Sequence, residues 1–424
     1  MYEKIGNYRW RIVALLFFAT TINYIDRQVI GLLKPYIETE MGWSEINYGQ
    51  IVTAFQSAYA IGLLLSGRML DKLGTRIGFS IAIIVWSFSG MLHAAARSVF
   101  AFGSARFLLG LGESANFPAS IKTVAEWFPR KERALATGIF NSGSTIGAIV
   151  APIIVTYITL NFGWRWAFII TGLFGFIWLI FWLSIYKSPN NHKKVTKAEL
   201  NHILVDKEES SNVSLKWVDL FRYRQTYAIC LSRFVSEWVW WFFLFWAPDF
   251  LKKTQGVNIK EVVLPLIIIY SLAGFGGIAG GWISGYFIKI GNTVDKARKK
   301  TILLCAMLAL PLIFVPMVNN LWVSVLLIAL ASAAHQGWAS NIFTIVSDIY
   351  PKNIVASVTG LAGFCAAVGG AISASVIGLV LELTNSYLLI FAMAGSVYII
   401  AWTIIKLMIP EIKPINIITT NINK

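Results

Sequence analysis

Ile22-Asn23-Tyr24-Ile25-Asp26-Arg27-Gln28 places an acid and a base side by side within an otherwise apolar run from about residue 12 to residue 33. At 1.5 Å per residue, a helix of that length crosses a bilayer core of about 30 Å. A charged side chain at the centre of a lipid-facing helix costs on the order of 3 kcal/mol, so such groups normally face a bundle interior or a wet cavity. Asp26 and Arg27 therefore predict a transport site, and the alternative is a buried pair that only fixes helix register.

The composition indicates a polytopic membrane protein. Of the 424 residues, 57% are hydrophobic and 13% are charged, and the mean hydropathy is +0.66. These values predict an all-α chain that crosses the membrane repeatedly. Hydropathy places twelve transmembrane spans at residues 12–33, 48–66, 77–95, 99–125, 133–157, 164–186, 226–250, 262–290, 301–318, 320–346, 354–382 and 386–408.

The longest polar connection divides the spans six and six. We expect an N-terminal half over residues 1–186, a cytoplasmic central loop over 187–224, a C-terminal half over 225–410 and a cytoplasmic tail over 411–424. Most of the 36 Lys and Arg lie in the tails and in the connections on the side of the termini, which predicts cytoplasmic termini in the inner (plasma) membrane. The net charge of +15 thus reflects the membrane topology of the chain, and no nucleic-acid partner is expected.

An internal repeat supports the division into two pseudo-symmetric halves. Glu126-Trp127-Phe128-Pro129-Arg130 through Ala134 to Thr137-Gly138 matches Asp348-Ile349-Tyr350-Pro351-Lys352 through Ala356 to Thr359-Gly360 at an offset of 222 residues. Both copies lie between the fourth and fifth span of their half, as parallel repeats require. The same offset carries Glu113 onto His335, so each half holds one titratable group at a similar depth.

Arg106 and Glu113 add a second acid and a second base. They lie seven residues apart, close to two helical turns, so both project from one face of the fourth span. With Asp26 and Arg27 they form a set that can exchange partners when a proton is added. We expect Asp26 or Glu113 to couple transport to H+, with no other cofactor and no metal, and the alternative is a set of structural ion pairs.

Arg27 is the candidate for holding an anionic substrate, because a guanidinium stays charged and binds a carboxylate through two hydrogen bonds. Further candidate substrate contacts, each with the alternative of a satisfied core group, are Tyr24, Gln56, Tyr59, Asn141, Ser144, His335, Trp338 and Asn341. The aromatic run 238–246 suits either stacking on sugars or an interfacial belt. Glu237, just before it, either reaches the outer surface or pairs with Arg233.

The loop after the second span is a candidate conformational latch. Its glycines permit a tight turn, and Asp71 can cap a helix end or pair with a base across the domain. The latch residues are Gly67, Asp71, Lys72, Gly74 and Arg76. The three cysteines, at positions 230, 305 and 365, lack metal-ligand spacing and are interpreted as packing residues.

The segment from Gly67 to Arg76 resembles the loop signature of the major facilitator superfamily, and twelve helices with a central loop match it over nearly the whole chain. Within this superfamily, residues 23–27 and 106–118 resemble the anion:cation symporter family. Residues 127–133, 140–144 and 334–338 look like its hexuronate transporters.

The resemblance implies proton-coupled import of D-glucuronate or D-galacturonate. By motif match, Arg27 would bind the carboxylate beside Tyr24 and Tyr59, Asp26 and Glu113 would be the proton sites, and Arg106 would pair with them during the cycle. The chain departs from the family at two places. Ser144 stands where galactonate-type members carry Gln, and Glu237-Trp238 stands where hexuronate carriers tend to show Asp-Pro.

Other function classes fit less well. A carrier of another organic anion, such as an aldonate, tartrate or an aromatic carboxylate, belongs to the same class, whereas a transporter-like sensor would need a larger domain than residues 187–224. An enzyme would need a nucleophile–base or metal constellation, which four scattered histidines do not offer. We therefore expect a monomeric carrier of a small organic anion, embedded in the lipid bilayer, that works by alternating access.

Overall fold

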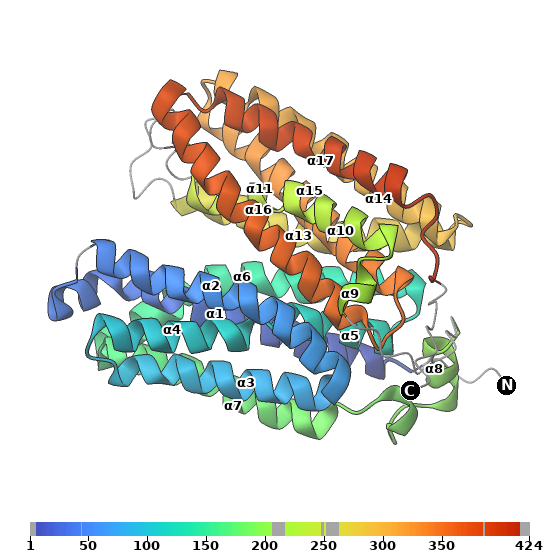
Figure 1. Cartoon of the computed structure of the whole chain (residues 1–424), viewed down its shortest axis with the longest axis horizontal. Coiled ribbons are helices and arrows are strands. Elements are labelled where there is room, and N and C mark those ends of the chain that lie inside the picture. The colour runs from blue at the N-terminus through green and yellow to red at the C-terminus, as the bar shows by residue number, and fades with distance from the viewer. Residues whose placement is uncertain are drawn as a thin grey trace.

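The computed structural model describes residues 6–43, 45–205, 217–246, 250–251, 263–384 and 386–415, and all regular elements in these ranges are helices (Figure 1). The first part of the chain forms α1 (Tyr8–Met41), α2 (Glu45–Leu73), α3 (Thr75–Leu92), η1 (His93–Ala95), α4 (Val99–Glu113), α5 (Asn116–Trp127), α6 (Arg130–Phe162) and α7 (Trp164–Ile185). The described part of the predicted central loop contains η2 (Pro189–Asn191), α8 (Lys197–Ile203) and α9 (Trp217–Leu220).

The second part of the chain repeats this plan. It forms α10 (Arg224–Ser236), α11 (Trp238–Phe245), α13 (Val263–Lys289), α14 (Val294–Ala309), η3 (Leu310–Met317), α15 (Leu321–Ile349), α16 (Val355–Thr384) and α17 (Leu388–Met408). Each predicted span overlaps one of these helices or a consecutive pair. The predicted all-α fold, with twelve spans in two six-helix halves, is confirmed.

Eight helices in the described ranges are long and apolar enough to cross a membrane. The remaining spans are α1, α2, and the interrupted pairs α4–α5 and α10–α11. α1 carries Asp26 and Arg27 within its apolar run, and the breaks next to Glu113 and at Glu237 leave helices of 15, 12, 13 and 8 residues, each too short to cross a membrane alone. These charged residues and helix breaks are the ones that border the candidate site described below.

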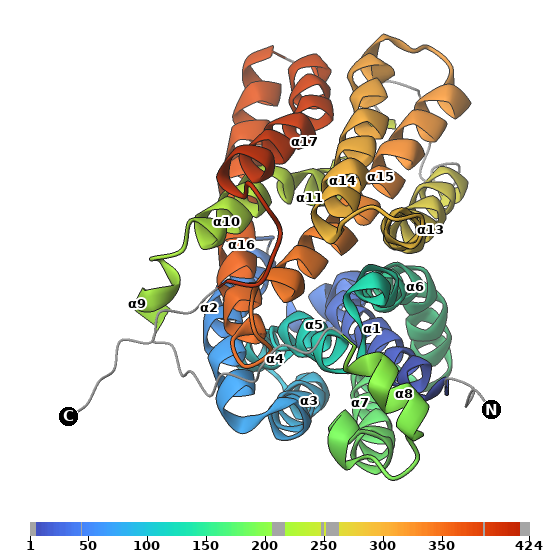
Figure 2. The ribbon, with the colours of Figure 1, turned by 90° about the vertical axis from the view of Figure 1, so that its right-hand side faces the viewer.

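The two halves form separate bundles that meet at one end of the molecule. In Figure 1 helices α1 to α7 form the lower bundle and helices α10 to α17 the upper one. Between the bundles, α2 packs against α16 and α6 against α13. Figure 2 looks onto the end where α1 and α6 begin, which we call the termini side.

Two glycines of the repeat explain why the bundles meet so closely. A Cβ on Gly138 of α6 would lie 2.3 Å from the carbonyl oxygen of Gly277, and one on Gly360 of α16 would lie 2.1 Å from that of Leu63. Both glycines therefore sit where helix backbones of opposite halves touch, and any side chain would push the halves apart. The Thr-Gly ending of the repeat thus marks equivalent contacts on the two sides of the molecule.

Candidate substrate cavity

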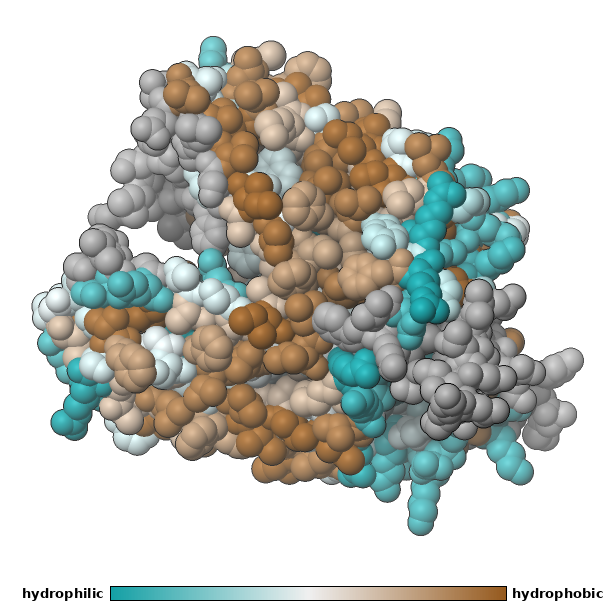
Figure 3. Space-filling model, viewed as in Figure 1, coloured by the Kyte–Doolittle hydropathy of each residue, from teal (hydrophilic) through white to brown (hydrophobic). Residues whose placement is uncertain are grey.

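A cavity of about 490 Å³ lies between the halves, with walls from both of them. Its N-half wall includes Tyr24, Arg27, Phe55, Gln56, Tyr59 and Phe117, and its C-half wall includes Arg233, Glu237, Trp238, Trp240, Trp241, Trp246, Phe343, Gly363, Ser373 and Ile377. Aromatic rings surround a few charged groups, as is typical of sites for small polar ligands. Figure 3 shows the notch between the halves on the side away from the termini.

Arg27 is the cationic group of the N-half wall. Its Nε donates to Glu113 Oε2 at 3.0 Å, and its Nη2 donates to Asn23 Oδ1 at 3.3 Å. Its guanidinium carbon lies 4.9 Å from the ring centre of Tyr24, 5.4 Å from that of Phe55 and 4.7 Å from that of Tyr59. The side chain is 16% exposed, so the guanidinium is oriented by its neighbours and still borders the cavity.

The groups behind Arg27 are more deeply buried. Glu113 is fully buried, and Arg106 of the same helix donates from Nη1 to the carbonyl oxygen of Arg27 at 3.4 Å. Asp26 is 3% exposed, and within the described residues neither of its carboxylate oxygens makes a hydrogen bond of normal geometry, although Thr171 of α7 lies close to it. The structure thus brings the four charged residues predicted from helix spacing into one cluster.

Local sequence explains how Glu113 reaches Arg27. The fourth span breaks between α4 and α5 directly after Glu113, where Pro118 has no N–H to donate to the carbonyl of Ser114. On the same helix, Gly110 packs against the backbone of α2, and a Cβ there would lie 2.6 Å from the carbonyl oxygen of Phe55. The break and the small residue bring α4 close to α1 and α2 at the depth of the cavity.

The C-half wall holds a second ion pair, between Arg233 and Glu237. The sequence analysis gave this pair as one of two alternatives for Glu237. Arg233 contacts Glu237 Oε2 through Nη2 at 3.0 Å and through Nε at 3.3 Å. Its guanidinium carbon lies 4.4 Å from the ring centre of Phe343. The i, i+4 spacing signalled this pair, but its place on the wall opposite Arg27 depends on how the two halves dock.

The other predicted substrate contacts lie outside the cavity lining. Asn141 donates to Gln336 Oε1 at 2.7 Å across the two halves, Ser144 donates to the Asn141 carbonyl, and Asn341 donates to the carbonyls of Gly280 and Gly337. His335 shares a 2.6 Å hydrogen bond with the Tyr398 hydroxyl, and the buried Trp338 packs on Tyr398. In this conformation all five are engaged in packing within or between the halves.

The predicted latch connects the halves on the termini side. Asp71 accepts from Lys122 Nζ at 2.8 Å and from the backbone N–H of Ser357, at the start of α16, at 2.7 Å. Gly67 packs on the backbone of Ala356, and Gly74 has a positive φ of 78°. Arg76 donates to the Leu183 carbonyl within its own half, and Lys72 is exposed.

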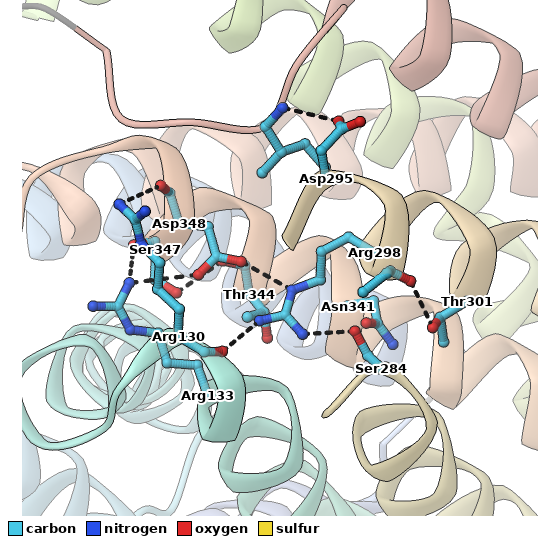
Figure 4. Close-up of polar contacts among 12 residues, drawn as sticks. Arg130, Arg133, Ser284, Asp295, Arg298, Thr301, Asn341, Thr344, Ser347 and Asp348 are labelled. Carbon is cyan, nitrogen blue, oxygen red and sulfur yellow. Dashed lines mark hydrogen bonds and ion pairs between the residues drawn. The ribbon is translucent and has the colours of Figure 1, made fainter. Parts of the chain in front are cut away.

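A second charged cluster closes the same side, between α6, α14 and α15 (Figure 4). Arg298 donates to Asp348 Oδ2 at 2.9 Å, to Ser284 Oγ at 2.6 Å and to the Arg130 carbonyl at 2.7 Å. Arg133 of the N-half lies 3.5 Å from Asp348 Oδ1 and donates to the Ser347 carbonyl. We call Arg130, Arg133, Arg298 and Asp348 the α6–α15 gate. Sequence reasoning matched Asp348 to the repeat but did not assign it a charged partner.

Two bundles around a central cavity that is closed on the termini side define a membrane carrier. A model of the Major Facilitator Superfamily matches residues 16–374 and 288–417. The chain is 32% identical to a hexuronate transporter of Escherichia coli (strain K12), covering 95% of each chain, and 29% identical to a probable galactarate/D-glucarate transporter of Bacillus subtilis (strain 168), covering 92% of this chain and 90% of that one.

Solved structures agree with the fold. A proton:xylose symporter of the same superfamily matches with a TM-score of 0.75 at 17% identity, over 96% of this chain and 97% of that one. The chain belongs to the Major Facilitator Superfamily. It is a multi-pass membrane transporter and not an enzyme.

Proposed function

We propose that this transporter imports a hexuronate, D-glucuronate or D-galacturonate, together with protons. The observation that carries the proposal is Arg27, a guanidinium on the cavity wall that is fixed by Glu113 and three aromatic rings. A substrate carboxylate can take the place of Glu113 on Arg27 through two hydrogen bonds. The similarity to a hexuronate transporter supports this choice of acid.

Proton coupling follows from the competition for Arg27. When a substrate carboxylate binds Arg27, the buried Glu113 loses its nearest cation, and a buried carboxylate without a partner is costly. Taking up a proton relieves that cost, and Arg106 stays beside it as an alternative partner. Asp26 is a second acid in the same cluster, so the site has capacity for two protons.

The closed side of the molecule identifies the conformation of the transporter in this structure. The latch at Asp71 and the α6–α15 gate hold the termini side shut, while the cavity extends toward Ser373 and Ile377 near the other end of α16. With both termini in the cytoplasm, as the distribution of Lys and Arg favours, this conformation faces outward. The protein then works as a monomer in the plasma membrane, with the two halves rocking about the cavity.

Uptake of labelled D-glucuronate into proteoliposomes under an inward proton gradient tests the proposal. We expect accumulation by the wild type and none by Arg27→Ala. Glu113→Gln should catalyse exchange of glucuronate but lose accumulation driven by the gradient, because the glutamine cannot carry the proton. Gradient-driven accumulation by a folded Glu113→Gln variant would contradict the assignment of Glu113.

Another sugar acid is the second candidate, since a probable galactarate/D-glucarate transporter is nearly as similar. Competition by unlabelled sugar acids separates the candidates. If glucuronate and galacturonate fail to compete while another organic anion accumulates, the hexuronate assignment is wrong and the carrier mechanism remains.

A further inference from the structure

Arg233 and Glu237 face the cavity from the C-half, opposite Arg27, and the proposed function gives them no role. Both belong to the seventh span, where α10 ends at Ser236 and α11 begins at Trp238. Tyr24 and Arg27 of the N-half line the same cavity as this pair of the C-half. A substrate whose carboxylate binds Arg27 therefore points its other end toward this pair.

The two members of the pair differ in what they offer a substrate. The Arg233 side chain is 9% exposed, its face lies against Phe343, and its Nη2 and Nε both contact Glu237 Oε2. The Glu237 side chain is 22% exposed, and its other oxygen, Oε1, takes no part in these contacts. The more accessible group is thus a hydrogen-bond acceptor with negative charge.

We propose that Glu237, held by Arg233, is a specificity-determining residue that binds substrate hydroxyl groups and excludes a second carboxylate. This inference rests on the proposed function, because it assumes that one carboxylate is bound at Arg27. Hydroxyl groups donate to Glu237, whereas a substrate carboxylate at that position would meet a like charge and would bring no hydrogen to donate to Glu237 Oε1. The cavity therefore selects sugar acids with one carboxylate over those with a carboxylate at each end.

The neighbouring rings favour the same kind of ligand. Trp238, Trp240 and Trp241 line the cavity beside Glu237, and aromatic faces stack on the C–H surfaces of sugars. A cyclic hexuronate presents such a surface together with hydroxyl groups at the end remote from its carboxylate. A linear diacid presents a second charge there instead.

D-galacturonate and galactarate form a matched pair for the test, because they share one carbon skeleton and galactarate carries a second carboxylate at C1. Both compounds are tested as inhibitors of the uptake of labelled galacturonate into proteoliposomes. The measured ratio is the inhibitory concentration of galactarate divided by that of unlabelled galacturonate. We expect galactarate to be at least about tenfold the weaker inhibitor of the wild type. The Glu237→Gln substitution should lower the ratio by about tenfold, because the amide accepts hydroxyls without repelling a carboxylate.

Two further variants keep the outcome interpretable. Glu237→Asp retains the charge and should retain a ratio close to that of the wild type. Glu40→Gln makes the same chemical change in a glutamate that pairs with Arg165 at 2.7 Å, 44% exposed at the far end of α1, and should leave the ratio unchanged. Glu237→Gln protein that is shown to be folded and keeps the wild-type ratio would overturn the proposal, as would a wild type that binds galactarate as tightly as galacturonate.

A failure of the proposed function can be recognised separately. If the wild type takes up neither hexuronate but accumulates D-galactonate, the hexuronate assignment fails, and the same ratio is measured with galactonate against galactarate. Discrimination against the diacid that depends on Glu237 would then still support the inference. Accumulation of galactarate alone would reject both.

Discussion

At the scale of single residues, Arg27 shows how one side chain serves both fold and site. Its Nε is committed to Glu113, and three rings restrict its orientation, yet the guanidinium borders the cavity. A lysine would keep the charge but could not contact two carboxylate oxygens in one plane. Replacing Arg27 with lysine therefore distinguishes two roles of the side chain, the positive charge and the planar pair of hydrogen-bond donors.

We expect Arg27→Lys to fold and to bind substrate about tenfold to 100-fold more weakly, because one charge-assisted hydrogen bond is worth roughly 1.5–3 kcal/mol. Equilibrium binding of labelled glucuronate to purified protein measures the loss. Arg165→Lys, at an exposed pair with Glu40, is the matched control and should bind normally. Unchanged affinity in Arg27→Lys would mean that Arg27 acts only as a point charge.

The sequence predicted the N-half cluster because its members are ordered by helix geometry. The spacing of Arg106 and Glu113 put both on one face, and Asp26 and Arg27 stood out as charges in an apolar run. Contacts between the halves could not be predicted from spacing along one helix. Asn141 meets Gln336 across 195 positions of sequence, and periodicity within one helix says nothing about such a partner. Asn141, which was expected to contact substrate, therefore lies at the contact between the halves.

At the scale of elements, the repeated glycines decide how close the helices of the two halves approach. The repeat predicted equivalent positions for Gly138 and Gly360, and the structure supplies the physical reason, since each touches a backbone carbonyl of the opposite half. The interruptions in the fourth and seventh spans were not predicted from hydropathy, because apolar residues on both sides of each break keep the average over the whole span high.

Gly360→Ala should prevent full closure of the termini side, because the added Cβ would lie 2.1 Å from the Leu63 carbonyl oxygen. Spin labels at the exposed positions Lys72 and Lys296, one in each half, report the separation of the halves. We expect a longer distance or a second population in Gly360→Ala.

Gly103→Ala is the control, because a Cβ on Gly103 has no atom within 4 Å. The two variants make the same chemical change and differ in their surroundings. Identical distance distributions in both would show that the Gly360 contact does not limit closure.

At the scale of the whole molecule, two charged clusters hold the halves together on one side, and the cavity formed by the described residues extends toward the other side. Each cluster joins both halves, through Asp71 and the N–H of Ser357 in one and through Arg133 and Asp348 in the other. This arrangement makes the closed state of the termini side dependent on buried electrostatics as well as on packing.

Asp348→Asn should weaken that closure strongly. Arg298 and Arg133 are at most 2% exposed, and loss of the shared carboxylate leaves two buried guanidinium groups undercompensated, at a cost of roughly 3–5 kcal/mol. We expect a lower melting temperature and a longer distance between the labels described above. Glu411→Gln removes an exposed partner of Lys413, a pair worth about 1 kcal/mol or less, and should change neither quantity.

The open side of the cavity can be located by chemical labelling. A single cysteine at Ser373, on the cavity wall, should react with a membrane-impermeant thiol reagent added outside cells, in a variant without the three native cysteines. Bound substrate should slow the reaction. A cysteine at Ser347, which is 2% exposed and accepts a hydrogen bond from Arg133 of the α6–α15 gate, should not react. Reaction only from the cytoplasmic face would show that the cavity opens inward and would contradict the outward-facing assignment.

The burial of the α6–α15 gate also has a consequence for the ionic environment. Dissolved salt weakens attraction between charges that water can reach, but it acts far less on pairs inside protein. Because Asp348, Arg298 and Arg133 are almost fully enclosed, potassium and chloride cannot collect around them. The closure of the termini side at this gate should therefore change little through the swings in intracellular ionic strength that accompany osmotic stress.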